Sequence, residues 1–311
     1  MPQATREIKY RIRSIKSTRQ ITKAMELVSA AKMRRAVANV LATRTYARLG
    51  WQLLEELAHR TDPSHHPLLQ RREKVMRVGL VLVTSNRGLC GGFNHQVTNA
   101  ANAYIRKHQE SQVELGADLV AVGKRGRDIM YRYGQAIVAE FTKADLTTRL
   151  DEVRPIARLL IDDYLSGRYD RVVMAYTDFI SPLTQKPTIK QLLPIEREVD
   201  LKLGQSRESA KGVAQEASGH QGAFAYEYLF EPTPDEVLED LLPRLLEVQI
   251  YQALLESDAS EHSARMLAMR NASDAAKDMI DSLTLEFNQA RQAGITAELA
   301  EIIGGRVAVE G

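Results

Sequence analysis

The 311-residue chain has a single cysteine, Cys90, and this scarcity sets the first limits on its chemistry. One cysteine excludes an internal disulfide and any metal site built from several thiolates, so no redox switch operates within one copy. The sequence also lacks a run of about 18 consecutive apolar residues, and its N-terminus lacks the apolar core of an export signal. We therefore expect neither a membrane span nor an export signal.

Glycine and proline are missing from residues 3–49, a region rich in Ala, Arg, Lys, Met and Leu. These residues favour helix, and the missing helix breakers predict one long N-terminal helix. Apolar residues follow the alternating spacing of four and three that is typical of a coiled-coil seam. The residues of this predicted seam are Ile8, Ile12, Ile15, Ile21, Met25 and Val28.

A second long helix is predicted near the C-terminus. Thr233 can cap it and Glu236 completes a capping box, while Pro243 is expected to kink its first turns. Residues 244–293 again contain no glycine or proline. At 1.5 Å per residue each terminal helix would reach roughly 70 Å, which is too long for a small domain. We therefore predict that the two helices pair as an extended antiparallel coiled coil.

The middle of the chain has a different pattern, with short β-branched runs between helical stretches. This alternation predicts a mostly parallel α/β sheet. The predicted strands are 77–83, 119–122, 137–139 and 171–176, and the predicted helices include 94–109 and 151–165. Residues 203–222 are rich in Gly, Ser, Gln and Ala, which predicts a mobile surface insertion. The predicted domains are 1–62, 75–230 with this insertion, and 233–305.

Charge is distributed unevenly, although the whole chain carries only +2. Residues 1–48 contain twelve Lys or Arg and two Glu, a net charge of +10. Residues 231–260 contain eight Asp or Glu and one Arg, a net charge of −7. A basic helix is either a solvated face or a surface for nucleic acid or for an acidic protein.

The glycine-rich loop 84–94 follows a strand and opens a helix, the place where nucleotide-binding folds hold phosphates. It matches neither common phosphate-loop pattern, so we expect a structural tight turn in which three glycines supply backbone freedom. These glycines are Gly88, Gly91 and Gly92. Cys90 is interpreted as a small core residue rather than a nucleophile, and His65-His66 as a surface turn rather than a metal site.

Three motifs resemble the gamma-subunit family of F-type ATP synthases. They are ITKAMELVSAAKM at 21–33, RGLCGGFN at 87–94, and the last helix with ARMLAMRNASD at 264–274 and FNQARQAGITAELAEIIGG at 287–305. The resemblance implies an antiparallel coiled coil joined to a Rossmann-like α/β domain. It also implies a rotor shaft, which couples ion-driven rotation of a membrane ring to conformational changes at catalytic beta subunits.

The implied partners are the alpha and beta subunits of the catalytic hexamer, the epsilon subunit and the membrane-embedded c-subunit ring, with no nucleic acid. The chain itself would bind no cofactor and hold no catalytic site, because ATP, ADP and Mg belong to the partner subunits. It would be peripheral on the cytoplasmic face of a bacterial membrane. The sequence does not decide between proton and sodium coupling.

The resemblance also assigns residues to roles. Contacts with the hexamer are expected at Lys23, Met25, Arg265, Arg291, Gln292, Thr296 and Glu298. Contacts with the ring are expected at Tyr228 and Glu231. The structural loop comprises Arg87, Gly88, Cys90, Gly91 and Gly92.

The chain departs from the family pattern at three residues. Asn86 stands where the family usually has Asp, which removes a charge from the loop. Ala297 and Ala300 replace Gln and Thr, so contacts near the C-terminus are expected to be weaker. The 203–222 insertion has no cysteine pair, which argues against thiol regulation.

Two alternatives remain open from the residues alone. A coiled-coil protein that binds nucleic acid through its basic first helix would show a salt-dependent DNA shift. A small α/β enzyme built on Cys90 would lose its activity in Cys90→Ser, whereas a rotor subunit would tolerate that substitution.

Overall fold

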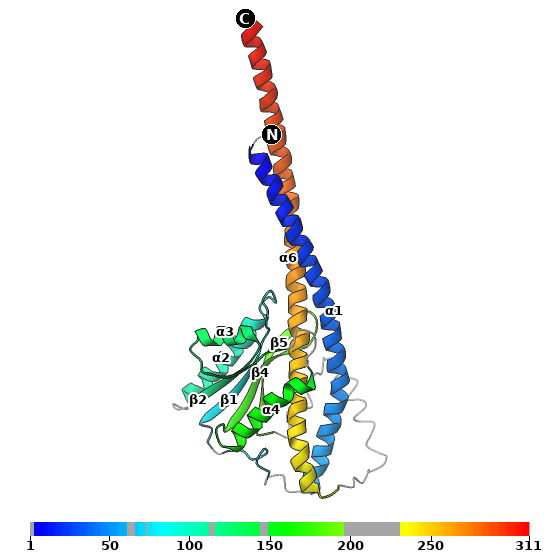
Figure 1. The fold of residues 1–311 in the computed structure, drawn as a ribbon, viewed down its shortest axis with the longest axis vertical. Helices are drawn as coiled ribbons and strands as arrows, with labels where there is room; N and C mark the ends of the chain where they lie inside the picture. Colours follow the sequence, from blue (N-terminus) through cyan, green and yellow to red (C-terminus); the bar gives the residue numbers. More distant parts are fainter. Residues whose placement is uncertain are drawn as a thin grey trace. The chain divides into compact units, whose positions relative to one another are not determined.

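A computed structural model describes residues 3–60, 66–72, 74–111, 116–143, 149–195 and 231–310. Two compact units are present, Met1–Ser29 with Arg265–Gly311, and Ala30–Ala264 (Figure 1). The first is called the paired-helix unit and the second the sheet unit. The predicted insertion 203–222 lies outside the described residues, and the predicted domain limits stay a prediction.

The described residues of the sheet unit form one sheet of five strands in the order β3-β2-β1-β4-β5. Their bounds are β1 Arg77–Val83, β2 Gly116–Val122, β3 Ile137–Phe141, β4 Arg171–Phe179 and β5 Gln185–Leu193. The first four strands are parallel, and β5 is antiparallel to β4. Strand β1 is central and buried along almost its whole length, as its unbroken apolar sequence requires.

Helices cover both faces of this sheet (Figure 1). On one face, α2 (Phe93–Ser111) and α3 (Lys124–Arg132) pack against Leu80 and Leu82 of β1. On the other face, α4 (Leu150–Leu165) and the first part of α6 (Pro234–Glu310) pack against Val81 and Val83. Helix α6 therefore serves as one layer of a doubly wound domain.

The predicted mixed α/β fold is confirmed, and each predicted strand overlaps an observed one. Strand β5 is missing from the prediction. Its sequence, QKPTIKQLL, is polar and contains Pro187. Proline is tolerated in β5 because this strand forms the edge of the sheet. The existence of β5 becomes evident only from its pairing with β4 in the folded chain.

Helix α1 (Gln3–Arg60) extends beyond the region free of glycine and includes Gly50. A Cβ atom at Gly50 would lie 2.6 Å from Cδ2 of Leu245 on α6, so the two helices approach closely at this point. A larger residue at this position would require the end of the Leu245 side chain to shift.

Helix α6 begins as the sequence predicts. The hydroxyl of Thr233 accepts a hydrogen bond from the backbone N–H of Glu236 at 3.3 Å, which confirms the N-cap. The helix then continues through Pro243. Pro243 is the tenth residue of the helix, beyond its first turn, so its missing N–H leaves the carbonyl oxygen of Glu239 without the usual helical donor.

In the paired-helix unit, the residues of α1 and α6 run in opposite directions (Figure 1). The buried seam of α1 here differs from the predicted one. Thr22 and Ser29 are buried, whereas Ile21 and Val28 are 58% and 55% exposed. The heptad that begins at Thr5 and Ile8 continues through small polar residues, because these let two helices approach closely. The matching buried residues on α6 are Met269, Ser273, Ala276 and Ile280.

Candidate functional site

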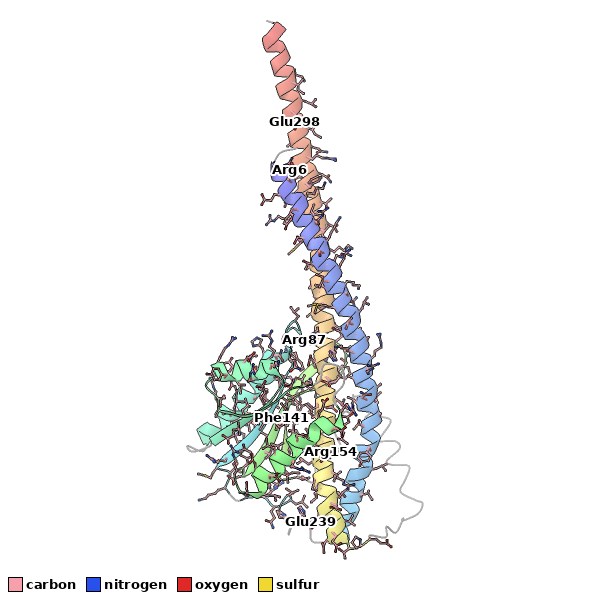
Figure 2. The ribbon with its side chains drawn as sticks, in the orientation of Figure 1. Arg6, Arg87, Phe141, Arg154, Glu239 and Glu298 are labelled. Atoms are coloured by element: carbon pink, nitrogen blue, oxygen red, sulfur yellow. The ribbon has the colours of Figure 1, made fainter. Side chains whose placement is uncertain are left out.

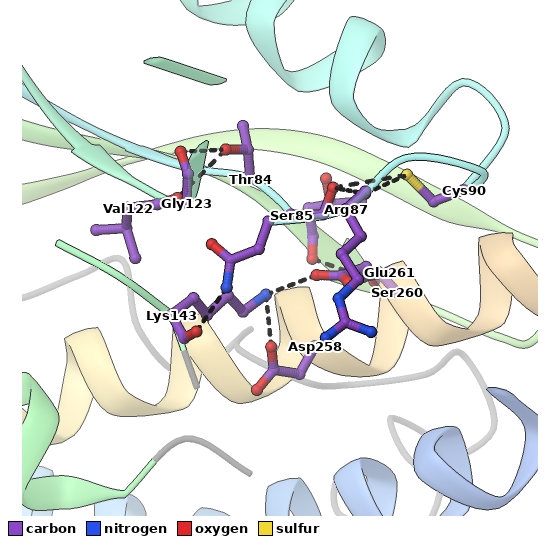
Figure 3. A network of polar contacts seen from close by, with 12 residues as sticks. Thr84, Ser85, Arg87, Cys90, Val122, Gly123, Lys143, Asp258, Ser260 and Glu261 are labelled. Carbon is purple, nitrogen blue, oxygen red and sulfur yellow. Dashed lines mark hydrogen bonds and ion pairs between the residues drawn. The ribbon is translucent and has the colours of Figure 1, made fainter. Parts of the chain in front are cut away.

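The candidate site lies in the sheet unit, where β1 and β4 end beside each other. From β1 the chain adds β2 and then β3 on one side of the sheet, and it adds β4 and β5 on the other side of β1. The direction in which strands are added therefore reverses between β1 and β4. Doubly wound folds place their ligands at this switch point. In this chain the switch point is occupied by residues 84–94 and by one face of α6 (Figure 3).

The loop after β1 is held by its own side chains. Asn94 Oδ1 accepts a hydrogen bond from the Ser85 backbone N–H at 3.0 Å, and Asn94 Nδ2 donates to the Ser85 hydroxyl at 2.8 Å. The Ser85 hydroxyl donates to the carbonyl oxygen of Arg87 at 2.6 Å. These buried bonds fix the turn between β1 and α2.

The turn uses glycine differently from the prediction. Gly91 has a positive φ of 57°, but Gly88 and Gly92 do not, and Leu89 has a positive φ of 63°. Of the three glycines expected to need a positive φ, only Gly91 has one. The surrounding hydrogen bonds hold Leu89 in a conformation that side chains rarely adopt.

The first N–H groups of α3 are satisfied by the end of β1. The backbone N–H of Gly126 donates to the Thr84 hydroxyl at 2.8 Å, and that of Arg125 donates to the Ser85 carbonyl at 3.0 Å. A phosphate bound at a helix N-terminus needs these N–H groups. In α3 the protein's own atoms already occupy them.

Asn86 links this loop to the segment after β3. Its side-chain Nδ2 donates to the carbonyl oxygen of Lys143 at 2.6 Å, and its Oδ1 accepts from the backbone N–H of Lys124 at 3.4 Å. An aspartate in this position can accept but cannot donate. Asn86, at the position where the resemblance leads us to expect Asp, thus provides a hydrogen-bond donor for the Lys143 carbonyl oxygen.

Lys143 forms a buried ion triad with α6 (Figure 3). Its Nζ lies 2.5 Å from Asp258 Oδ1 and 3.0 Å from Glu261 Oε2. The three side chains are 4%, 8% and 10% exposed. Burial by itself lowers the pKa of Lys143, but the two carboxylates outweigh burial and raise the pKa above its usual value, so the lysine stays charged.

Further hydrogen bonds join the same stretch of α6 to β4 and to the turn that follows it. The Ser260 hydroxyl donates to the Thr177 carbonyl at 3.2 Å. The Ser263 hydroxyl donates to the Pro182 carbonyl at 2.6 Å and accepts from Gln185 Nε2 at 3.4 Å. The polar face of α6 from 258 to 263 is therefore a docking face for the sheet.

Cys90 and His66 both have structural contacts. The Cys90 thiol is buried and accepts from Asn94 Nδ2 at 3.2 Å. His66 Nδ1 accepts from the Leu68 backbone N–H at 3.2 Å, and burial lowers the pKa of His66. Within the described residues no cluster of three or more His, Cys, Asp or Glu side chains is arranged to hold a metal ion.

The predicted partner contacts are not among the residues of this site. Arg291, Gln292, Thr296 and Glu298 lie on exposed turns of α6, and Lys23 is exposed on α1 and paired with Glu26 at 2.9 Å. Figure 2 shows Glu298 on α6 and Arg6 on α1, both in the paired-helix unit. Met25 and Arg265 are partly buried, and Glu231 is exposed just before α6. Tyr228 lies outside the described residues.

The sequence analysis missed the residues of the ion triad. Lys143 lies in a polar segment with no motif, and no pattern marks it. Asp258 belongs to the acidic stretch 231–260, to which the sequence analysis assigned no role. The available signal is its spacing of three from Glu261, which places both carboxylates on one helical face.

Fold and site together define a class: a doubly wound α/β domain whose switch point is filled by its own loop and fastened to a long C-terminal helix. A family model described as ATP synthase matches residues 4–309. The ATP synthase gamma chain of Herpetosiphon aurantiacus is 44% identical over 98% of this chain and 99% of its own length. That of Roseiflexus castenholzii is 45% identical over 98% of each chain. The chain belongs to the family of ATP synthase gamma chains.

Solved structures share the fold. A chain in the rotor and ring of the Tetrahymena thermophila mitochondrial ATP synthase has a TM-score of 0.57 and 22% identity, covering 81% of this chain and 99% of that one. A chain of the Euglena gracilis mitochondrial ATP synthase has a TM-score of 0.63 and 20% identity, covering 98% and 94%. None of the described helices is long and apolar enough to cross a membrane.

Proposed function

We propose that this chain is the central rotor shaft of an F-type ATP synthase. The observation that carries the proposal is the continuity of α6, which is one helix from Pro234 to Glu310. Its first part is a layer of the sheet unit and its last part pairs with α1 in the paired-helix unit. A continuous helix that belongs to both units is the connection that a rotor shaft requires.

The partners of such a shaft are the alpha and beta subunits, the epsilon subunit and the c-subunit ring. Lys23, Arg291 and Glu298 are exposed, as contacts with a surrounding hexamer require. Glu231 is exposed at the start of α6, where a contact with the ring is proposed. Met25, Gln292, Thr296, Arg265 and Tyr228 complete the proposed contacts.

Catalysis belongs to the partner subunits in this proposal. The chain binds no nucleotide, and ATP, ADP and Mg are bound by its neighbours. Support comes from the starts of α2 and α3, where the backbone N–H of Phe93 is already bonded to the Cys90 carbonyl and those of Arg125 and Gly126 to Ser85 and Thr84. The chain is peripheral on the cytoplasmic face of the membrane, and the ring decides whether protons or sodium ions drive it.

The test is purification of the tagged full chain from its native membranes. Recovery of alpha and beta subunits with magnesium-dependent ATP hydrolysis is expected, and this activity is lost when residues 1–25 and 291–311 are both removed. The matched control is Cys90→Ser, which retains the activity because the buried thiol makes hydrogen bonds only within its own loop, and a hydroxyl can replace them. Recovery of the chain alone, or with nucleic acid, contradicts the rotor role.

A further inference from the structure

The apolar contact between the sheet and α6 does not by itself select one position. Leu238, Leu242, Leu246, Ile250 and Leu254 recur along α6 at intervals of four or so and pack against the sheet. A shift by one helical turn, about 5.4 Å, replaces each apolar side chain by a similar one. Hydrophobic contacts have no preferred direction, so they tolerate such a shift better than polar contacts do.

The ion triad distinguishes these positions. In the observed position, the Lys143 ammonium meets two carboxylates from a single face of α6, Asp258 and Glu261. A shift of four residues in one direction would replace these partners with Leu254 and Ser257. A shift in the other direction would offer His262 and Arg265, and the arginine carries the same charge as the lysine.

A wrong position is therefore costly. It would leave one buried lysine and two buried carboxylates without their opposite charges, and an uncompensated buried charge strongly destabilises the folded chain. The lysine itself is fixed in place, because Asn86 holds its carbonyl oxygen at 2.6 Å. The triad thus joins the end of β1, the end of β3 and α6 in one arrangement.

We propose that Lys143 is a positioning residue that fixes the register of the sheet domain along and around α6 through Asp258 and Glu261. Buried ionic groups are best attested in such a register-setting role. The functional consequence rests on the rotor role proposed above. A rotor whose sheet domain slips on its helix loses part of each rotation before it reaches the other unit.

The test measures register directly in the purified full chain. Spin labels are placed at Tyr131→Cys on α3 and Asp240→Cys on α6, which are both exposed positions of the sheet unit. The distance distribution between them is recorded by pulsed electron resonance. The chain with the native triad is expected to give one narrow distance distribution. Labelling of the chain without the two added cysteines measures how much label Cys90 takes up, and little is expected because Cys90 is buried.

Two variants separate register from stability. Lys143→Met leaves two buried carboxylates unpaired, and its unfolding midpoint is expected to fall by about 10 °C. The triple variant K143M/D258N/E261Q removes all three charges, so most of that loss is expected to be recovered. Its distance distribution should nevertheless broaden about twofold or split in two, because the hydrogen bonds of Ser260 and Ser263 then oppose the shifted positions without the charges.

The matched control is Arg154→Met, which breaks an exposed ion pair between α4 and α6, Arg154 to Glu247 at 3.8 Å. This control should keep the narrow distribution, as should Lys143→Arg. A narrow distribution in the triple variant overturns the proposal, as does equal broadening in Arg154→Met.

The consequence for rotation is measured separately in the complex purified with alpha and beta subunits. The triple variant should hydrolyse ATP at the native rate but transport severalfold fewer ions for each ATP. Native transport in a triple variant with a broadened distribution overturns the functional consequence but leaves the register role intact. Failure of the rotor role appears instead as a native chain that recovers no ATPase.

Discussion

Gly123 and Gly134 both have a positive φ, 98° and 74°, but their surroundings differ. A Cβ atom at Gly123 would lie 2.3 Å from the Thr84 carbonyl oxygen, whereas nothing lies within 4 Å of one at Gly134. We expect Gly134→Ala to cost about 1–2 kcal/mol from backbone strain alone. Gly123→Ala should cost more than about 4 kcal/mol, because the end of β1 must move. Denaturant unfolding of the two variants checks this, and equal losses would contradict it.

Asp170 ties the chain before β1 to the chain before β4. Its carboxylate accepts hydrogen bonds from the backbone N–H groups of Met76 and Arg77 at 2.8 and 3.0 Å, and it pairs with Arg72 at 2.9 Å. Burial raises the pKa of Asp170, but these donors outweigh burial and hold it below its ordinary value of 3.8.

Asp170→Asn is therefore expected to lower the free energy of unfolding by about 1–3 kcal/mol at neutral pH. The native carboxylate stabilises the fold above its unfolded pKa, and this contribution is lost as the pH falls through the lower folded pKa. The difference between native chain and variant should thus shrink below about pH 4. Urea unfolding at several pH values measures it.

The control for this experiment is Asp151→Asn on α4. The Asp151 side chain is 66% exposed, and its ion pairs with Arg149 and Arg154 are open to solvent. Exposed pairs contribute little, so a change under about 0.5 kcal/mol is expected at every pH. A pH-independent loss in Asp170→Asn would show that its charge has no part in the effect.

At the scale of an element, the seam of α6 can be tested with adjacent residues. Ile280 is 8% exposed and Met279 is 57% exposed. Ile280→Ala should lower the stability of the paired helices by about 2 kcal/mol or more, because it removes buried methyl groups. Met279→Ala should change stability by less than about 0.5 kcal/mol. Thermal unfolding followed by circular dichroism compares the two, and equal effects would place the seam elsewhere.

The elements were predictable where local pattern determines them. Strand β1 was predicted with its observed bounds, and the Thr233 cap was found from its motif. The seam of α1 was misplaced from Ile21 onward, because its buried residues there are Thr22 and Ser29. Apolar periodicity does not detect a seam that continues through small polar side chains.

The candidate site was predictable only in part. The loop motif places Ser85, Cys90 and Asn94 near each other because they are close in sequence. Lys143 and Asp258 are 115 positions apart, and their ion pair exists only once the sheet has packed on α6. Long-range pairs between single charged residues leave no local signature, so the triad required the folded chain.

At the scale of the whole molecule, the +10 charge of residues 1–48 is a feature that association with the proposed partners can test. We expect the rate of association with the alpha and beta subunits to fall about tenfold between roughly 0.05 and 0.5 M salt. Stopped-flow mixing measures this rate. Replacing the exposed Arg6, Arg11 and Arg13 with Gln should flatten the salt dependence while leaving helix content unchanged. A rate independent of salt in the native chain would contradict electrostatic attraction.

The use of α6 as a layer of the sheet unit sets the order of events during synthesis. The last of the described strands ends at Leu193, but the helix that covers Val81, Val83 and Met174 begins only at Pro234. While the ribosome makes the intervening residues, one face of the sheet has no α6 to bury its apolar side chains. Exposed apolar strands invite aggregation, so the nascent chain is most in need of a chaperone in that interval. The need ends when the segment up to Ala264 has emerged.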